Sequence, residues 1–205
     1  IDTVESATLG AFVLTSLNQA TLTNTGAATP LTGQAHAQDI TITAGSNSRT
    51  IEISANDSVR TITKRINAVA GATGVTAEAR TFARLSSVDT TGAATAKIKI
   101  NGTETAAFSL SSSDVSDAVT KINAISATTG VQASATDDYK VLLSDKWGDT
   151  IKIQNTSTRT NIKVESLAND GTTAHSTAIT MATADANSSS ATVTGTMRLT
   201  SATEF

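Results

Sequence analysis

The chain has 205 residues, a net charge of −3, 16% charged residues, 3% aromatic residues and no cysteine. The weakly negative net charge argues against electrostatic binding of nucleic acid. The lack of cysteine excludes disulfides and thiolate metal sites. No apolar run approaches the ~20 residues of a membrane-spanning helix, so we predict neither a nucleic-acid partner nor membrane insertion.

Residues 1–38 are predicted to hold stem strands and a linker. Ile1 to Leu17 favours an extended conformation, because apolar residues recur on one face of a strand there. Thr23 to Gln38 is rich in Thr, Gly and Ala and contains the only proline, Pro30, which is typical of a loop.

Residues 39–90 are predicted to form a β-β-α-β-β unit. Isoleucines alternate with polar residues over 40–42 and again over 51–53, and the Gly-Ser-Asn-Ser segment between them predicts a hairpin. The next apolar residues are spaced by three, four and three positions, which predicts one buried stripe of a helix: Val59, Ile62, Ile66 and Val69.

The ends of this helix carry recognisable signals. Asp57 or Ser58 is suited to the N-cap, and Gly71 or Gly74 is expected to stop the helix because glycine accepts a left-handed conformation. Small apolar and polar residues then alternate, which predicts a strand over 75–80 and a further strand over 84–86.

Residues 91–166 are predicted to repeat this order. Asn101-Gly102 is the strongest two-residue hairpin signal, placed between a strand at 98–100 and a return strand over 106–110. A helix is predicted over Val115 to Ile125, with Ser113 as its N-cap. Later strands are predicted over 131–135, 139–143, 150–154 and near 162–164.

The two units share a signature at a constant offset of 56 positions, the difference between 59 and 115. Apolar, polar and glycine positions all keep this spacing, which favours two copies of one supersecondary unit. The signature residues are Ile66, Asn67, Ala68, Gly74 and Val75 in the first copy, and Ile122, Asn123, Ala124, Gly130 and Val131 in the second.

Residues 167–205 are rich in Ser, Thr and Ala and resemble the opening segment in composition. We predict that this return segment pairs with the N-terminal stem. The predicted fold class is therefore α+β: two β-β-α-β-β units, each a small, mainly antiparallel sheet covered by one helix, plus an extended stem from paired chain ends.

No residue pattern predicts catalysis, a cofactor or a metal. His36 and His175 lie in small-residue segments without Asp or Glu at ligand spacing. Asp137-Asp138, and Asp145 with Asp149, resemble turn residues more than a calcium site, because Asp is selected in turns for local hydrogen bonds. We therefore predict that the chain is not an enzyme.

Six polar or aromatic positions allow either a structural or a binding role. Asn67 and Asn123 are expected to satisfy backbone groups where the chain leaves each helix. Trp147 is expected to cover the edge of its own sheet, with an exposed contact role as the alternative. Asn101, Asn155 and Asn187 begin short sequences that fit the N-glycosylation pattern, a motif with many false matches.

The signature residues resemble the flagellin hook IN motif, which occurs in bacterial flagellins and some hook-associated proteins. The opening Ile1 to Gly10 also resembles the passage from a flagellin's rod domain into its outer region. The resemblance implies a fragment from the surface-exposed outer (D2 and D3) region of a flagellin, an extracellular filament subunit that serves motility. Its implied partners are other flagellin subunits, bound through rod-domain helices absent from this sequence, and host surfaces or antibodies.

Two other protein classes stay open. An outer domain of a hook-associated or capping protein fits the same motif, and the flanking sequence would distinguish it from a flagellin. An adhesin-like binding module would call for a cluster of exposed aromatic residues, for which Tyr139 and Trp147 are the candidates.

The hydroxyl-rich segments are also expected to carry O-linked sugars, as happens in the flagellin family.

Overall fold

The computed structural model describes residues 12–14, 21–23, 37–44, 46–55, 57–88, 94–158, 161–175, 177–184 and 189–201. The predicted α+β class is confirmed, since a few short helices pack on mainly antiparallel sheets. The helices are α1 (Val59–Ala68), α2 (Ala70–Thr73), α3 (Ser116–Asn123) and α4 (Ser126–Thr129). None of the helices described is long and apolar enough to cross a membrane.

The strands form two larger sheets and two ribbons of paired strands. They are β1 (Phe12–Leu14), β2 (Thr21–Thr23), β3 (Gln38–Ala44), β4 (Asn47–Ile53), β5 (Val75–Ser87), β6 (Ala94–Ala96), β7 (Ile98–Ile100), β8 (Thr103–Glu104), β9 (Phe108–Leu110), β10 (Gln132–Ala135), β11 (Val141–Asp145), β12 (Ile151–Asn155), β13 (Ile162–Leu167), β14 (Ile179–Met181), β15 (Ser190–Val193) and β16 (Thr196–Ser201).

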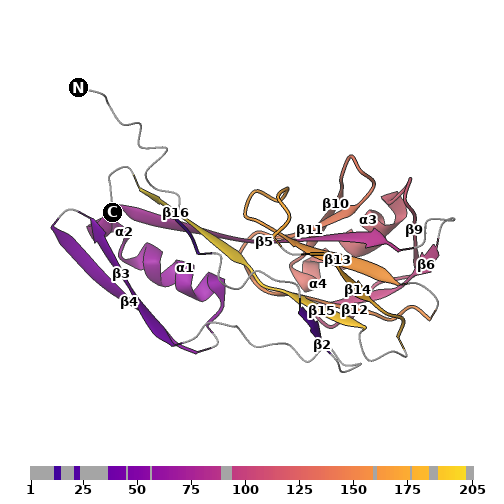
Figure 1. Cartoon of the computed structure of the whole chain (residues 1–205), viewed down its shortest axis with the longest axis horizontal. Coiled ribbons are helices and arrows are strands. Elements are labelled where there is room, and N and C mark those ends of the chain that lie inside the picture. Colours follow the sequence, from indigo (N-terminus) through magenta and orange to yellow (C-terminus); the bar gives the residue numbers. More distant parts are fainter. Residues whose placement is uncertain are drawn as a thin grey trace.

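Strand β5 runs along the long axis of the molecule and joins its two parts (Figure 1). Its first half, 75–80, pairs with β16. Its second half pairs with β11 over 81–85 and with β13 over 82–87, so β11 and β13 lie on opposite edges of it. The same strand therefore serves both ends of the structure.

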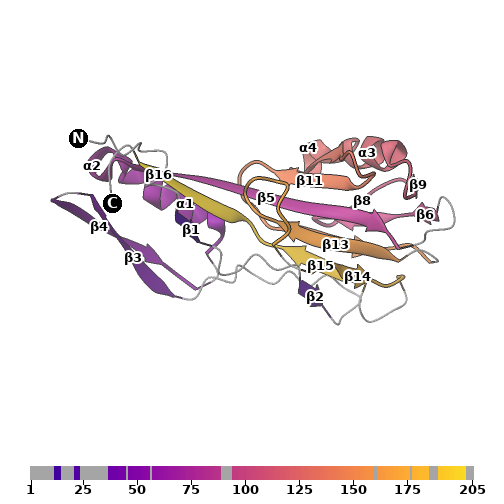
Figure 2. The ribbon, with the colours of Figure 1, turned by 45° about the horizontal axis from the view of Figure 1, so that its top comes forward.

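The buried apolar side chains form two clusters. The α1 core lies between the β3–β4 hairpin and the β5–β16 pair, and contains Ile42, Ile51, Ile53, Ile62, Ile66, Val75, Ala77, Met197 and Leu199. The α3 core collects buried residues from α3 and from strands β5 to β7 and β9 to β15. Figure 2 shows α3 and α4 on one side of the sheet that contains β5 and β11.

The chain ends contribute strands to both sheets. β1 pairs antiparallel with β16, with Phe12 opposite Leu199. β2 pairs with β15, and β15 continues through β12 and β7 to β8 in a five-stranded sheet. The sheets thus cross the predicted domain boundaries at residues 90 and 166.

The strand prediction after the first helix was wrong in one respect. Two strands are predicted, over 75–80 and 84–86, but the structure has the single strand β5. No Gly, Pro, Asn or Asp interrupts residues 75–87, so nothing in this stretch favours a turn. Buried side chains alternate with more exposed ones along most of β5, and Val75, Ala77 and Ala79 lie on the buried face.

The return strand of the second hairpin also differs from the prediction. Asn101-Gly102 forms the predicted turn, with φ of 48° and 87° at the two residues. Thr103–Glu104 pairs back on β7 and the Thr105 amide donates to the Ile98 carbonyl at 2.9 Å, whereas Phe108–Leu110 pairs with β6. The chain therefore leaves the hairpin after Thr105 and starts a separate ribbon.

Helix α1 begins as predicted, but the start of α3 does not. Ser58 caps α1 by accepting a hydrogen bond from the Thr61 amide at 3.2 Å. The N-cap of α3 is Val115, not Ser113, and it makes no side-chain cap bond. Asp114 instead accepts a hydrogen bond from the Ser116 amide at 2.9 Å, so a neighbouring carboxylate performs the capping role.

Candidate functional site

The first copy of the repeat signature holds a side-chain bridge from helix α1 to strand β5. Asn67 donates its amide N–H to the Ala77 carbonyl at 2.9 Å and accepts the Ala77 N–H at 2.7 Å. Both backbone groups of Ala77 are therefore satisfied on the edge of β5 that faces away from β16. A side-chain amide carries the same donor and acceptor as a peptide, so it replaces a neighbouring strand at this position.

The second copy holds the same bridge from helix α3 to strand β10. Asn123 donates to the Ala133 carbonyl at 2.9 Å and accepts the Ala133 N–H at 2.8 Å. Strand β10 is the last strand in the order of its sheet, so Asn123 again covers an open strand edge. We call this pair of hydrogen bonds the asparagine latch.

The helix exits of the two copies also match bond by bond. Gly74 and Gly130 have φ of 68° and 75°, and each amide bonds four residues back to close a short second helix. Thr73 Oγ1 accepts the Val75 N–H, and Thr129 Oγ1 accepts the Val131 N–H, both at 3.2 Å. These threonines are buried, so their hydroxyls satisfy the amide that opens the following strand.

The remaining signature residues divide between core and surface. Ile66 and Ile122 are 0% exposed and face the α1 core and the α3 core respectively. Val75 and Val131 are also fully buried, whereas Ala68 and Ala124 are exposed. The signature is thus brought together in each copy around one latch, and it forms no cavity.

The role expected for the two asparagines differs in one detail from the observed one. Each satisfies backbone groups, but these belong to a residue of the next strand and not to the helix end. Sequence reasoning missed Ala77 and Ala133 as partners. The sequence did hold a signal for these partners. Ala77 and Ala133 are 56 positions apart, as the two asparagines are, and each ends the matching segment that begins with Thr-Gly-Val.

Trp147 is exposed, which fits the alternative of an exposed contact residue. Its side chain is 54% exposed and lies near two cations, with Arg60 Cζ 5.5 Å and Lys146 Nζ 4.9 Å from the ring centroid. Arg60 also donates to the Asp149 carboxylate at 2.6 Å. The turn stays in place because the buried Asp145 carboxylate accepts the Trp147 and Asp149 amides.

Two glycines let this turn approach the middle of β5. Gly148 has φ of 76°, and a Cβ placed there would lie 2.5 Å from the Ala79 Cβ. A Cβ on Gly195 would lie 2.5 Å from the Gly148 carbonyl oxygen. Thr81 adds a hydrogen bond from its hydroxyl to the Asp149 carbonyl at 2.7 Å.

Of the residues considered for chemistry, Asp145 and Asp149 lie in one turn, where the Asp145 carboxylate accepts the Asp149 amide at 3.0 Å. His36 and Asn187 lie outside the described residues, and the His175 amide bonds to the Ser166 carbonyl. Within the described ranges, no group of three or more His, Asp or Glu side chains is placed to hold a metal ion.

The two described N-glycosylation patterns are engaged in the fold. Asn155 is 0% exposed, and its amide donates to the Ala182 carbonyl at 2.9 Å. Asn101 donates to the Thr129 carbonyl and accepts the Lys152 amide, both at 2.9 Å. Because its side chain is buried, Asn155 is not accessible to a transferase in the folded chain.

A comparison with protein families matches residues 39–91 to the flagellin hook IN motif. The matched span contains β3, β4, α1, α2 and β5, and hence the first latch. No curated protein matches the chain. The motif match supports a flagellin-type, structural protein.

Proposed function

We propose that the chain is a surface-exposed outer region of a flagellin, built from two IN-type units on a stem of paired chain ends. The observation that carries the proposal is the recurrence of the asparagine latch. The matched motif contains Asn67 and its two bonds to Ala77. Asn123 and Ala133, outside the matched span, repeat these bonds to within 0.1 Å.

The latch supports a structural role because of what it connects. Each asparagine ties the end of an amphipathic helix to an open strand edge, which closes that edge against pairing with other chains. Open edges are a hazard for a protein that is present at high local concentration, as subunits of a filament are. We therefore propose that the signature residues stabilise each of the two units and keep its open strand edge from pairing with other chains.

The stem is supported by the strand pairs at the chain ends. β1 pairs with β16, and β16 pairs in turn with the first half of β5. An outer region inserted into a filament subunit needs its two ends at one place, and antiparallel pairing of the end strands provides this. We assign residues 1–38 and 167–205 to this stem and return, and 39–90 and 91–166 to the two units.

The outer surface of such a filament would be what host surfaces and antibodies meet, and would also carry any sugars. The experiment is immunogold electron microscopy on intact flagella, with antibodies raised against the folded chain. The proposal expects gold along the whole filament. Gold only at the hook junction or the tip would assign the chain to a hook-associated or capping protein, and absence of labelling on flagella would overturn the proposal.

O-glycosylation of the hydroxyl-rich segments is part of the proposal and has its own test. The intact mass of the natural protein, isolated from filaments, is expected to exceed the mass of the bare polypeptide. A mass equal to that of the bare polypeptide would remove this part and leave the structural role untouched.

The adhesin alternative is less well supported by the aromatic residues. Tyr139 and Trp147 are both exposed, at 52% and 54%. Tyr139 precedes strand β11 and Trp147 follows it, and five strand residues span roughly 16 Å. Two rings at opposite ends of a strand do not form one stacking platform, so the exposed aromatics favour no single sugar-binding face.

A further inference from the structure

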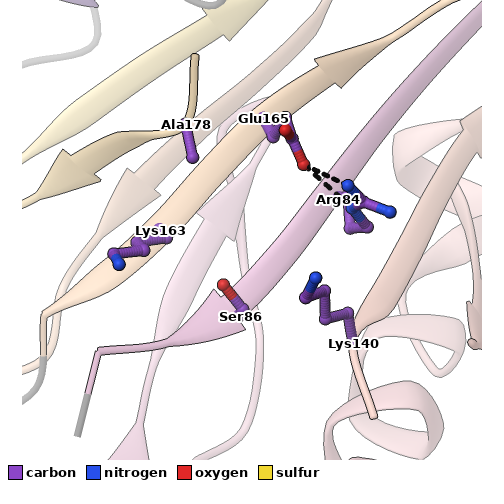
Figure 3. Close-up of a pocket in the computed structure, with 6 residues that line it drawn as sticks. All are labelled: Arg84, Ser86, Lys140, Lys163, Glu165 and Ala178. Carbon is purple, nitrogen blue, oxygen red and sulfur yellow. Dashed lines mark hydrogen bonds and ion pairs between the residues drawn. The ribbon is translucent and has the colours of Figure 1, made fainter. Parts of the chain in front are cut away.

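The outer face of the seven-stranded sheet carries a hollow of about 250 Å³. Figure 3 shows that Arg84 and Ser86 reach it from β5 and that Lys163 and Glu165 reach it from the neighbouring β13. In the strand register Glu165 lies opposite Arg84 and Lys163 lies opposite Ser86. These positions alternate with the buried Ala83, Leu85 and Val164, so the hollow lies on the face opposite the α3 core. Lys140 and Ala178 complete the lining.

The hollow has more positive than negative charge. Three of its lining residues are cations and one is a carboxylate. Arg84 uses Nε and Nη2 on a single oxygen of Glu165, at 2.9 and 2.5 Å, and both side chains are about four-fifths buried. Lys163 forms no ion pair with any residue of the described chain. Arg84 is therefore compensated by Glu165, whereas Lys163 brings an unpaired positive charge to the hollow.

The third cation of the lining, Lys140, lies at the rim and is paired. Lys140 pairs with Asp138 at 2.7 Å, just outside the hollow. The pKa of Asp138 lies below its usual value, first because Lys140 and then Thr136 donate hydrogen bonds to it, with a further contribution from the charge of Arg84.

The size and lining restrict what can bind. Sites for drug-sized ligands are usually about 300–1,000 Å³ and mostly apolar, so this hollow fits a smaller and more polar group. The ammonium group of Lys163 suits a carboxylate, which it binds more strongly than a neutral acceptor. The Ser86 hydroxyl and the second oxygen of Glu165 suit hydroxyl groups beside it. The lining contains no aromatic ring, so binding depends on polar contacts.

We propose that this hollow binds an acidic monosaccharide unit, in which a carboxylate and several hydroxyls sit on one small ring. Lys163 contacts the carboxylate, Ser86 and Glu165 contact ring hydroxyls, and the Arg84–Glu165 pair holds Glu165 in place. This proposal does not depend on the chain being part of a flagellin, so it can be tested independently of the proposed function.

The test is a calorimetric or NMR titration of the folded chain with methyl glucuronide, methyl glucoside and sodium sulfate. Saturable binding of the glucuronide at millimolar concentrations, with none of the glucoside, is the expected result. Equal binding of sulfate and glucuronide would overturn the saccharide part, because the hollow would then recognise only an oxyanion. No saturable binding of the glucuronide would overturn the proposal entirely.

Variants locate the binding and exclude a general charge effect. Lys163→Gln is expected to weaken glucuronide binding about fivefold to tenfold, as the loss of one charge-assisted hydrogen bond predicts. Lys64→Gln is the matched control. Lys64 is an exposed residue of α1, the helix of the other core, and its replacement should leave binding unchanged. If Lys64→Gln weakens binding as much as Lys163→Gln does, the hollow is not the site.

A second titration distinguishes two sources of the sugar. An oligosaccharide that ends in glucuronic acid binds more tightly than the methyl glucuronide if the natural ligand is a chain end. Equal affinities indicate a free monosaccharide. Both results support the site, because both require the same acidic ring in the hollow.

Discussion

Arg60 on helix α1 and Asp149 in the turn after β11 form an ion pair at 2.6 Å across 89 positions of sequence. This pair joins the helix of the α1 core to a turn of the α3 core. Close packing supports the ion pair. Gly148 lies against Ala79 in the middle of β5, and Gly195 lies against Gly148. The two parts are therefore fixed to each other at the point where β5 passes from one core to the other.

Replacing Arg60 by alanine should loosen this joint without unfolding the chain. The ion pair is about two-fifths exposed on both sides, so its loss and that of the contact with Trp147 should cost about 1 kcal/mol. Trp147 is the only tryptophan, so acrylamide quenching of its fluorescence reports the change directly. Quenching should increase in Arg60→Ala and stay unchanged in Lys64→Ala, an exposed change on the same helix. Equal quenching in Arg60→Ala and the parent chain would mean that Arg60 does not shield the ring.

Gly148 and Gly71 give a matched pair of glycine substitutions. Gly148→Ala puts a side chain at φ of 76° and 2.5 Å from the Ala79 Cβ, so the free energy of unfolding should fall by about 2 kcal/mol or more. Gly71→Ala lies in helix α2 with nothing within 4 Å of the new Cβ. It should be neutral or stabilise the chain by about 0.5–1 kcal/mol. Urea denaturation measures both, and a Gly148→Ala variant as stable as the parent would contradict the close packing of the joint.

Asp170 should make the stability of the chain depend on acid pH. Hydrogen bonds from the Thr173 hydroxyl and the Thr172 and Thr173 amides lower its pKa from 3.8 to about 2. Because the folded pKa is the lower one, the folded state gains stability above pH 3.8 and loses it as the pH falls towards 2. NMR titration of the carboxyl carbon measures the pKa. Thr173→Val should raise the pKa of Asp170, while Thr128→Val, a change at an exposed threonine elsewhere, should not; an ordinary pKa in the parent chain would contradict the hydrogen-bond geometry.

Local patterns predicted the elements of the fold well where a helix or strand has one buried face. The stripe that contains Ile62 and Ile66 identified α1, and Asn101-Gly102 identified a tight turn. Ile66 and Ile122 are both fully buried, as two matching helix faces require. In each case the signal is local, because periodicity and turn chemistry depend on neighbouring residues.

The pairing of strands could not be predicted in the same way. Alternation along 75–87 says which side chains are buried, but not that β16, β11 and β13 pair with one continuous strand. The contact of Trp147 with Arg60 joins residues that are far apart in the sequence. The cationic hollow was missed for the same reason, since Arg84, Lys140 and Lys163 come together only through sheet pairing.

The most direct test of the central claim, that one unit is built twice around the same latch, is amide hydrogen exchange in Asn67→Ala and Asn123→Ala. Each latch makes two hydrogen bonds, so each variant should lose about 1–2 kcal/mol of stability. We predict faster exchange of the Ala77 amide in the first variant and of the Ala133 amide in the second, by similar factors, with no such change in Lys64→Ala or Thr128→Ala. Faster exchange in one variant and none in the other would contradict the claim that the two units are copies of one design.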